Sequence, residues 1–201
     1  MKTGAKKRAR KADLTPLPSQ TVGPYFQIAM TGPRMISQIA GPKAKGERLK
    51  LVCTVFDGQG VPVPDGVIEI WQANAEGKYN HPSDKQKKPI DPGFLGFGRQ
   101  STDDDGMCTF ETIRPGCVPG WKGRQQAPHL EVSVMARGVL KRLATRIYFA
   151  DDPANDADPA LALVPSARRS TLIAQPISGE PGAWRHDIHL SGEMETVFFD
   201  V

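Results

Sequence analysis

Long apolar runs, paired cysteines and the common nucleotide or nucleophile motifs are all missing from this 201-residue chain. No apolar run approaches the ~20 residues of a membrane-spanning helix, and no apolar stretch of a secretory signal follows the basic N-terminus. Cys53, Cys108 and Cys117 include no CxxC pair, which disfavours a disulfide framework or a zinc site and favours reduced thiols. GxSxG, Walker and dinucleotide-binding motifs are absent. We therefore expect a cytoplasmic chain without a membrane segment.

Positive charge is concentrated at the N-terminus. Six of the 26 Lys and Arg residues lie among the first eleven residues, which include no Asp or Glu, and the rest of the chain carries 20 basic and 22 acidic residues. We interpret residues 1–13 as a basic, disordered leader. The mixed charges and few aromatic residues of the remaining chain give no indication of a nucleic-acid-binding surface.

Proline dominates the segment that follows the leader. Pro16, Pro18 and Pro24 predict an extended, polyproline-like stretch up to Phe26 rather than a helix or strand. An irregular connector is expected over residues 30–46, so that residues 14–48 form an arm and connector. Such an arm can clamp the edge of its own domain or form the wall of a pocket in another chain.

From Leu49 onward, short segments with a period of two predict strands. The first is clearest, because Leu49, Leu51, Cys53 and Val55 share one face and Asp57–Gly60 supplies turn residues. Strands are expected at residues 49–56, 67–71, 107–113, 127–136, 143–149, 184–190 and 195–199, the last two closing a hairpin. Short helices are expected near 159–163 and 167–172, and a long polar loop at 80–98. With 20 Gly and 18 Pro, residues 49–201 predict one all-β domain, an antiparallel β-sandwich or open barrel with long loops.

One pair of side chains has the spacing of metal ligands. His129 and Glu131 lie two residues apart on a predicted strand and point to the same side. Tyr79, on a loop, could join them, and its oxygen would suit ferric iron better than zinc. A hydrogen-bonded surface pair explains the same spacing, so spacing alone does not decide. His186 and His189 are three apart and are expected to face opposite sides of their strand.

Several segments, in order from Thr15 to the C-terminus, resemble the intradiol ring-cleaving dioxygenases. They are PSQTVGPYF, DGVIEIWQANAEGKY with the Asn-His-Pro that follows, APHLEVSVMARG, TRIYFADD and ETVFFD. The resemblance is strongest to the α-type chain of two-chain members. It implies a β-sandwich, in agreement with the predicted strands.

The resemblance also implies where a metal would bind. Catalytic chains of the family hold a non-haem ferric ion with two tyrosines and two histidines. This chain matches only two of those ligands, at Tyr79 and His129, while Val118 and Glu131 stand at the other two positions. Nearby, the resemblance places Gln126 where an arginine is usual and Arg146 where a glutamine is usual. We therefore expect no metal ligands and no catalytic residues on this chain alone, and the ferric iron on a partner β chain.

For an α-type chain, the resemblance implies that the substrate pocket lies between the α and β chains. The substrate-binding residues expected here are Thr21, Gly23, Pro24, Tyr25 and Arg137. The implied reaction is cleavage of a small aromatic catechol acid by O₂. Arg137 could instead form an interface salt bridge.

Two alternatives remain open at this point. One is a self-sufficient metalloprotein with a site rebuilt from Tyr79, His129 and Glu131. The other is a non-catalytic sandwich that binds a small ligand.

Overall fold

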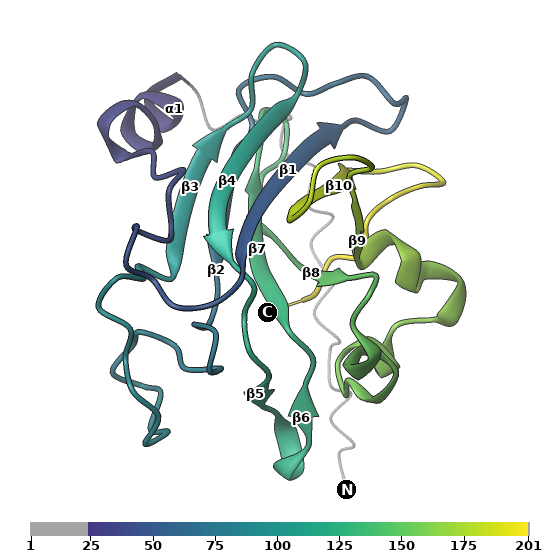
Figure 1. Ribbon diagram of the computed structural model, residues 1–201. Helices are drawn as coiled ribbons and strands as arrows, with labels where there is room; N and C mark the ends of the chain where they lie inside the picture. The colour runs from purple at the N-terminus through teal and green to yellow at the C-terminus, as the bar shows by residue number, and fades with distance from the viewer. Residues whose placement is uncertain (1–23, 201) are drawn as a thin grey trace, which may run out of the picture.

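The computed structural model describes residues 24–200, which are mostly β-structure with a few short helices (Figure 1). The strands are β1 (Arg48–Phe56), β2 (Val67–Trp71), β3 (Phe97–Ser101), β4 (Met107–Ile113), β5 (Val118–Pro119), β6 (Gln125–Gln126), β7 (His129–Met135), β8 (Leu143–Phe149), β9 (Ile173–Pro176) and β10 (Ala183–His189). The helices are α1 (Pro24–Met30) and the 3-10 helices η1 (Gly32–Arg34), η2 (Trp121–Gly123), η3 (Pro153–Ala157), η4 (Leu161–Leu163) and η5 (Ser166–Leu172). None of the helices in this described part is long and apolar enough to cross a membrane.

Eight strands form one sheet in the order β3-β2-β7-β8-β9-β10-β1-β4, and β5 and β6 form a separate hairpin. The long sheet folds over on itself, so that β1 and β4 pass in front of β7 in Figure 1. β8 pairs with β9, and β1 with β10, in parallel. The predicted all-β sandwich is therefore confirmed in its class, but its sheet is mixed rather than purely antiparallel.

The core lies between the two halves of the folded sheet and follows from the alternation in each strand. In β1 the side chains predicted to face inward are buried, and in β7 buried and partly exposed side chains alternate after the first two residues. Both halves contribute to one hydrophobic cluster that includes Leu51, Ile70, Leu130, Phe110 and Ile188. Because the inward face of β7 is filled by apolar side chains, its polar side chains lie on the outer face.

The predicted turn after β1 is confirmed. The Asp57 carboxylate accepts hydrogen bonds from the backbone N–H groups of Gln59 and Val61, and Gly60 has a φ of 79°. A positive φ is readily adopted by glycine but is unfavourable for other residues. The turn residues identified in the sequence therefore reverse the chain as predicted.

Two element predictions at the chain ends are wrong. Residues 24–26 begin α1 instead of continuing an extended stretch, because the fixed φ of proline is compatible with the first turn of a helix. Residues 195–199 do not form a strand paired with β10. Thr196 still hydrogen-bonds to His189, but the tail then crosses to β8, where the Phe199 N–H donates to the Ala144 carbonyl.

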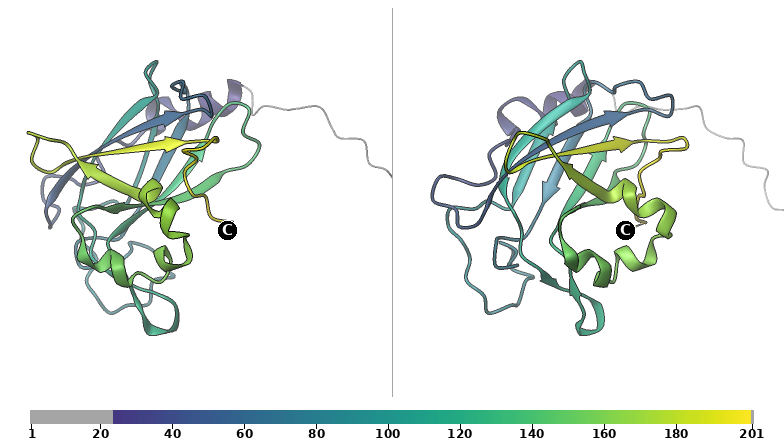
Figure 2. Two further views of the ribbon diagram at one scale, coloured as in Figure 1. Left: turned by 90° about the vertical axis from the view of Figure 1, so that its right-hand side faces the viewer. Right: turned by 45° about the vertical axis from the view of Figure 1, so that its right-hand side comes forward.

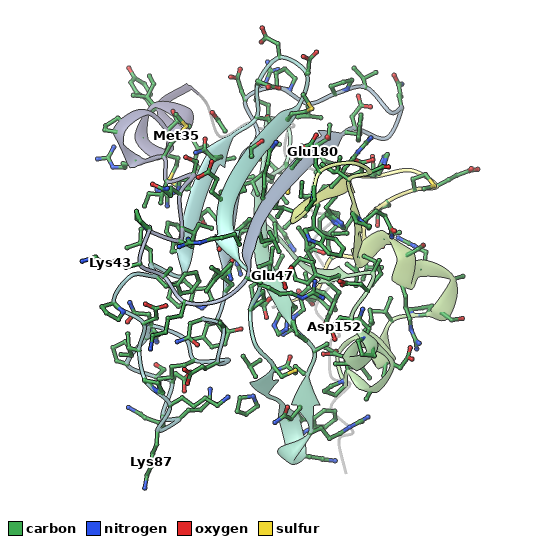
Figure 3. The ribbon with its side chains drawn as sticks, viewed as in Figure 1. Met35, Lys43, Glu47, Lys87, Asp152 and Glu180 are labelled. Carbon is green, nitrogen blue, oxygen red and sulfur yellow. The ribbon has the colours of Figure 1, made fainter. Side chains whose placement is uncertain are left out.

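Two strands of the eight-stranded sheet, β3 and β9, were not predicted, and neither was the short β5–β6 hairpin. β3 begins inside the predicted long loop, and β9 directly follows the helix expected at 167–172. Both are short and lack a clear period of two. The rest of the long loop remains irregular, and Lys87 projects from it away from the sheet (Figure 3).

Candidate functional site

The outer face of β7 brings the two predicted ligand positions together. Successive strand residues point to opposite faces, so His129 and Glu131 share a side while Leu130 and Val132 enter the core. The His129 Nε2 atom lies 3.3 Å from Glu131 Oε1. His129 is almost fully buried, whereas the Glu131 side chain is 38% exposed. The prediction that both side chains point to the same side is confirmed.

An arginine from the neighbouring strand pairs with this carboxylate. Arg146 in β8 lies opposite Glu131 in the β7–β8 register, and its Nη2 atom is 2.7 Å from Glu131 Oε1. Its Nη1 atom donates to Gln126 Oε1 at 2.6 Å and to the Tyr148 hydroxyl at 3.4 Å. The outer face therefore carries a connected polar network around a guanidinium group.

The charges of this network are mutually stabilised. Burial alone would raise the pKa of Glu131, but contact with His129 and the charge of Arg146 lower it. Burial alone would lower the pKa of Arg146, but the charge of Glu131 and the hydrogen bond with Tyr148 raise it. Both groups are therefore ionised near neutral pH.

Tyr79 is held at the edge of the same face by a tightly bonded loop. The buried Lys78 ammonium lies 3.1 Å from Asp84 Oδ1 and donates to the Gln86 carbonyl, and the Tyr79 N–H donates to Asp84 Oδ2. The ring of Tyr79 stacks on that of Trp71 with centroids 6.2 Å apart. Burial, followed by the charge of Glu131, raises the pKa of Tyr79 to about 12. Tyr79 is therefore a neutral phenol at neutral pH.

The residues around His129 do not fit a ferric ion held by two tyrosinates and two imidazoles. Val118, opposite Gln126 in the β5–β6 hairpin, is buried and has no donor atom. Glu131 is engaged by Arg146, whose fixed positive charge opposes a cation at the same place. Among residues 24–200, no three His, Cys, Asp or Glu side chains are gathered to hold a metal ion.

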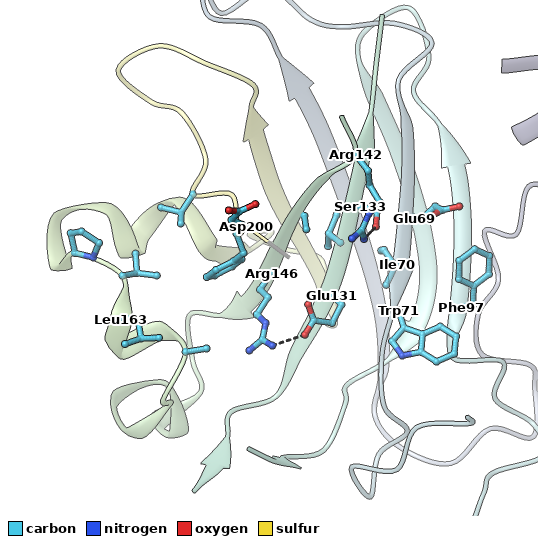
Figure 4. Close-up of a pocket in the computed structure, with 17 residues that line it drawn as sticks. Glu69, Ile70, Trp71, Phe97, Glu131, Ser133, Arg142, Arg146, Leu163 and Asp200 are labelled. Carbon is cyan, nitrogen blue, oxygen red and sulfur yellow. Dashed lines mark hydrogen bonds and ion pairs between the residues drawn. The ribbon is translucent and has the colours of Figure 1, made fainter. Parts of the chain in front are cut away.

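A groove of about 600 Å³ opens beside this network (Figure 4). Glu131 and Arg146 lie in its middle, Trp71 and Phe97 at one end, and Leu163 at the other. The C-terminal tail and η4 form one wall, on the side of the sheet where η3–η5 gather (Figure 2). Apolar walls around a few charged groups are typical of a binding surface. This wall was not predicted from the sequence, because residues 195–199 were expected to pair with β10.

Of the residues predicted to bind substrate, Tyr25 and Arg137 do not line this groove. Thr21 and Gly23 lie outside the described residues, and Pro24 is described only as the first residue of α1. Tyr25 is 83% exposed on α1. Arg137 is exposed just beyond the end of β7, opposite the end that carries His129.

Comparison with known proteins gives consistent relatives. The chain is 42% identical over 199 residues to the protocatechuate 3,4-dioxygenase alpha chain of Burkholderia cepacia, covering 92% of this chain and 96% of that one. The alpha chain of Pseudomonas putida is 39% identical, with 91% and 95% covered. The beta chain of Burkholderia cepacia is 40% identical over 133 residues, covering 65% of this chain and 56% of that chain.

Solved structures and a family model agree with these relatives. The dioxygenase domain of a dioxygenase carbohydrate-binding protein fusion from Streptomyces sp. SirexAA-E is 27% identical, with a TM-score of 0.59 and coverage of 89% of this chain and 99% of that one. A family model described as "Dioxygenase" matches residues 22–192. This chain therefore belongs to the intradiol dioxygenase family.

Proposed function

We propose that this chain is the alpha subunit of a heteromeric protocatechuate 3,4-dioxygenase and is active only with a beta subunit that carries the ferric iron. The assembled enzyme cleaves protocatechuate between its two hydroxyl-bearing carbons and incorporates both atoms of O₂, giving 3-carboxy-cis,cis-muconate in aromatic catabolism. Similarity to two alpha chains over more than nine-tenths of this chain supports the assignment. The free thiols of Cys53, Cys108 and Cys117 are consistent with a cytoplasmic location.

The observation that carries the proposal is the incomplete donor set. Tyr79 and His129 stand at ligand positions of the family, but Val118 offers no donor atom and Glu131 is paired with Arg146. A chain with this face cannot supply the usual iron centre by itself. The beta chain of Burkholderia cepacia is similar to this chain over 133 residues, which supports an assembly of two similar chains related by pseudo-symmetry.

In this assembly the N-terminal arm contributes to the substrate pocket through Thr21, Gly23, Pro24 and Tyr25. Support comes from α1, where Tyr25 is 83% exposed and Ile28 is 67% exposed. Neighbouring exposed apolar side chains of this size mark an interaction surface. We propose that the partner chain buries this surface.

Arg137 is proposed to recognise the substrate carboxylate. Its exposed position after β7 leaves the guanidinium available to another chain or a ligand. A guanidinium can bind a carboxylate through two parallel hydrogen bonds, and a charge-assisted hydrogen bond is worth about 1.5–3 kcal/mol. The arginine therefore suits an acid substrate better than plain catechol.

Co-expression tests the assembly. The full chain is produced alone and together with a beta chain, and each preparation is assayed for iron, visible absorbance and O₂ uptake with protocatechuate. We expect colourless, inactive alpha chain and a coloured, active pair, because tyrosinate bound to ferric iron absorbs visible light. Coloured and active alpha chain alone would contradict the proposal.

A substitution tests the substrate role. Arg137→Gln in the pair is expected to raise KM for protocatechuate by about 10- to 100-fold, the loss of one charge-assisted hydrogen bond. Activity on catechol, which lacks the carboxylate, should change little. Lys141→Gln, an exposed cation in the same loop, is the matched control. Equal effects on both substrates would instead assign Arg137 to the subunit interface.

A further inference from the structure

The orientation of His129 is that of a metal ligand, although no metal would fit beside it. Its Nδ1 atom lies 2.7 Å from the Ala127 carbonyl oxygen. A carbonyl oxygen only accepts hydrogen bonds, so Nδ1 carries a proton and Nε2 is the remaining ligand atom. Nε2 is buried and makes no hydrogen bond to a described residue, and Glu131 Oε1 lies 3.3 Å from it. Metal-binding histidines are commonly fixed by such a hydrogen bond from the other nitrogen.

One oxygen donor lies close to this nitrogen. It is Glu131 Oε1, 3.3 Å away, and it belongs to the carboxylate that is paired with Arg146. An imidazole and a carboxylate are both ligands that first-row transition metals bind. Besides the incomplete donor set, the positive charge beside these two groups therefore opposes a metal ion.

Arg146 is the group whose positive charge makes this place unfavourable for a cation. Its guanidinium is within 2.7 Å of the Glu131 oxygen that also faces His129. Gln126 and Tyr148 fix the other side of the guanidinium, so the side chain cannot swing away without breaking several hydrogen bonds. The positive charge therefore stays next to the donors.

We infer that Arg146 stands in for a metal ion in this chain, neutralising Glu131 and keeping transition-metal cations away from His129. Arg146 would thus be a specificity-determining residue that restricts metal to one of two similar chains. Its place in an assembly rests on the proposed function. Exclusion of metal from this chain, however, is a property of the chain alone and can be measured without a partner.

The test is a cobalt(II) titration of the full-length chain. Wild type should bind no Co²⁺ at this place and show no visible ligand-field absorption. Arg146→Gln replaces the charge with a neutral side chain, and it should bind one Co²⁺ per chain with an apparent Kd at least about 100-fold below the highest Co²⁺ concentration at which wild type shows no binding. Adding His129→Gln to this variant should abolish the gain.

Arg142→Gln is the matched control. Arg142 lies on the same groove and donates to Ser133 Oγ at 3.0 Å, but it has no ion pair with a described residue. Removing its charge should leave Co²⁺ binding at the wild-type level. A comparable gain in this variant would mean that general surface charge, not Arg146, excludes the metal, and the inference would be wrong.

A second variant keeps the test decisive if Arg146→Gln unfolds because Glu131 loses its partner. Glu131→His with Arg146→Gln removes both charges together, and it should bind Co²⁺ more tightly than wild type by at least the same factor. Circular dichroism and a thermal melt establish that each variant is folded. Folded variants that bind no better than wild type, or wild type that binds through His129, would overturn the inference. An inactive alpha–beta pair would contradict only the proposed function.

Discussion

Two histidines in this chain are equally buried but have different surroundings. His129 in β7 and His186 in β10 are each 3% exposed, and the Nε2 atom of each makes no hydrogen bond to a described residue. His129 lies beside the ion pair of Glu131 and Arg146. His186 lines a separate hollow of about 450 Å³ between β9, β10 and η5.

The difference shows that burial of an imidazole does not by itself indicate a functional site. At His129 the other ring nitrogen is fixed by a backbone carbonyl, and a Glu131 carboxylate oxygen lies 3.3 Å from Nε2. At His186 the dominant effect is burial, which lowers the pKa to about 4, with Asp187 and His189 as smaller influences of opposite sign. One ring is oriented among charges, and the other is packed as a neutral polar group.

The largest expected effect comes from replacing Asp158, which supports the region around His129. Asp158 is fully buried and accepts hydrogen bonds from the N–H groups of Ala127, Ala160 and Leu161 and from the Tyr148 hydroxyl. Asp158→Ala leaves these donors buried and unpaired, so we expect a loss of about 3–5 kcal/mol in the free energy of unfolding. Chemical denaturation measures it.

The control for this prediction is an exposed acid on the neighbouring helix. Asp156→Ala lies in η3 and should change the free energy of unfolding by less than about 0.5 kcal/mol. If Asp158→Ala cost no more than this control, the hydrogen bonds of Asp158 to Ala127, Tyr148 and Leu161 could not be what holds this region together.

The second prediction concerns the His186 region and depends on pH. The folded-state pKa of His186 is about 4 and its ordinary value is 6.5. Between these values the unfolded chain binds the proton and the folded chain does not, so the free energy of unfolding falls as pH falls. The contribution over this window is about 3 kcal/mol. Denaturation at a series of pH values from 8 to 4 measures the slope.

His186→Leu should reduce this slope, because the titrating group is gone. His81→Gln, an exposed histidine in the long loop, should leave it unchanged. Carboxylates also titrate near pH 4, so the quantity to compare is the difference between each variant and wild type. A slope that is unchanged in His186→Leu would show that His186 is not the responsible group.

Sequence patterns predicted the strands best where one face is apolar and the segment is long. β2, β4 and β8 have the predicted boundaries, because their inward side chains are decided by local alternation. The C-terminal tail was mispredicted for a different reason. Its residues are β-branched and aromatic like those of a strand, but hydrogen bonding of Phe199 to Ala144, distant in sequence, takes the tail to β8.

The candidate site was predictable only in part. The two-residue spacing placed His129 and Glu131 on one side, which the structure confirms. Nothing in the local sequence indicates that Arg146 lies opposite Glu131, because the register of β7 and β8 is set by pairing across the sheet. The groove wall from η4 and the tail likewise depends on contacts between distant segments.

A third prediction compares the charged neighbours of the two histidines. Glu131→Gln leaves the largely buried guanidinium of Arg146 without its ion-pair partner. Because Glu131 is 38% exposed, we discount the cost of a fully buried pair and expect a loss of about 1–2 kcal/mol. Asp187→Asn, which removes the partner of the exposed Arg185, should cost less than about 0.5 kcal/mol at pH 8. Equal losses in the free energy of unfolding would show that the ion pair beside His129 stabilises the fold no more than the one beside His186.

The smallest expected effect comes from His189, which is three residues from His186 but points to the other side of β10. Its ring stacks on Phe56 with centroids 5.0 Å apart and is partly exposed. His189→Gln loses this stacking but keeps the backbone hydrogen bonds to Thr196, so we expect a loss of only about 0.5 kcal/mol. The fall in stability from pH 6.5 to 4 should persist, because His186 still titrates. A flattened pH profile in this variant would assign the slope to the partly exposed ring of His189. The evidence that His186 is packed as a neutral group would then be lost.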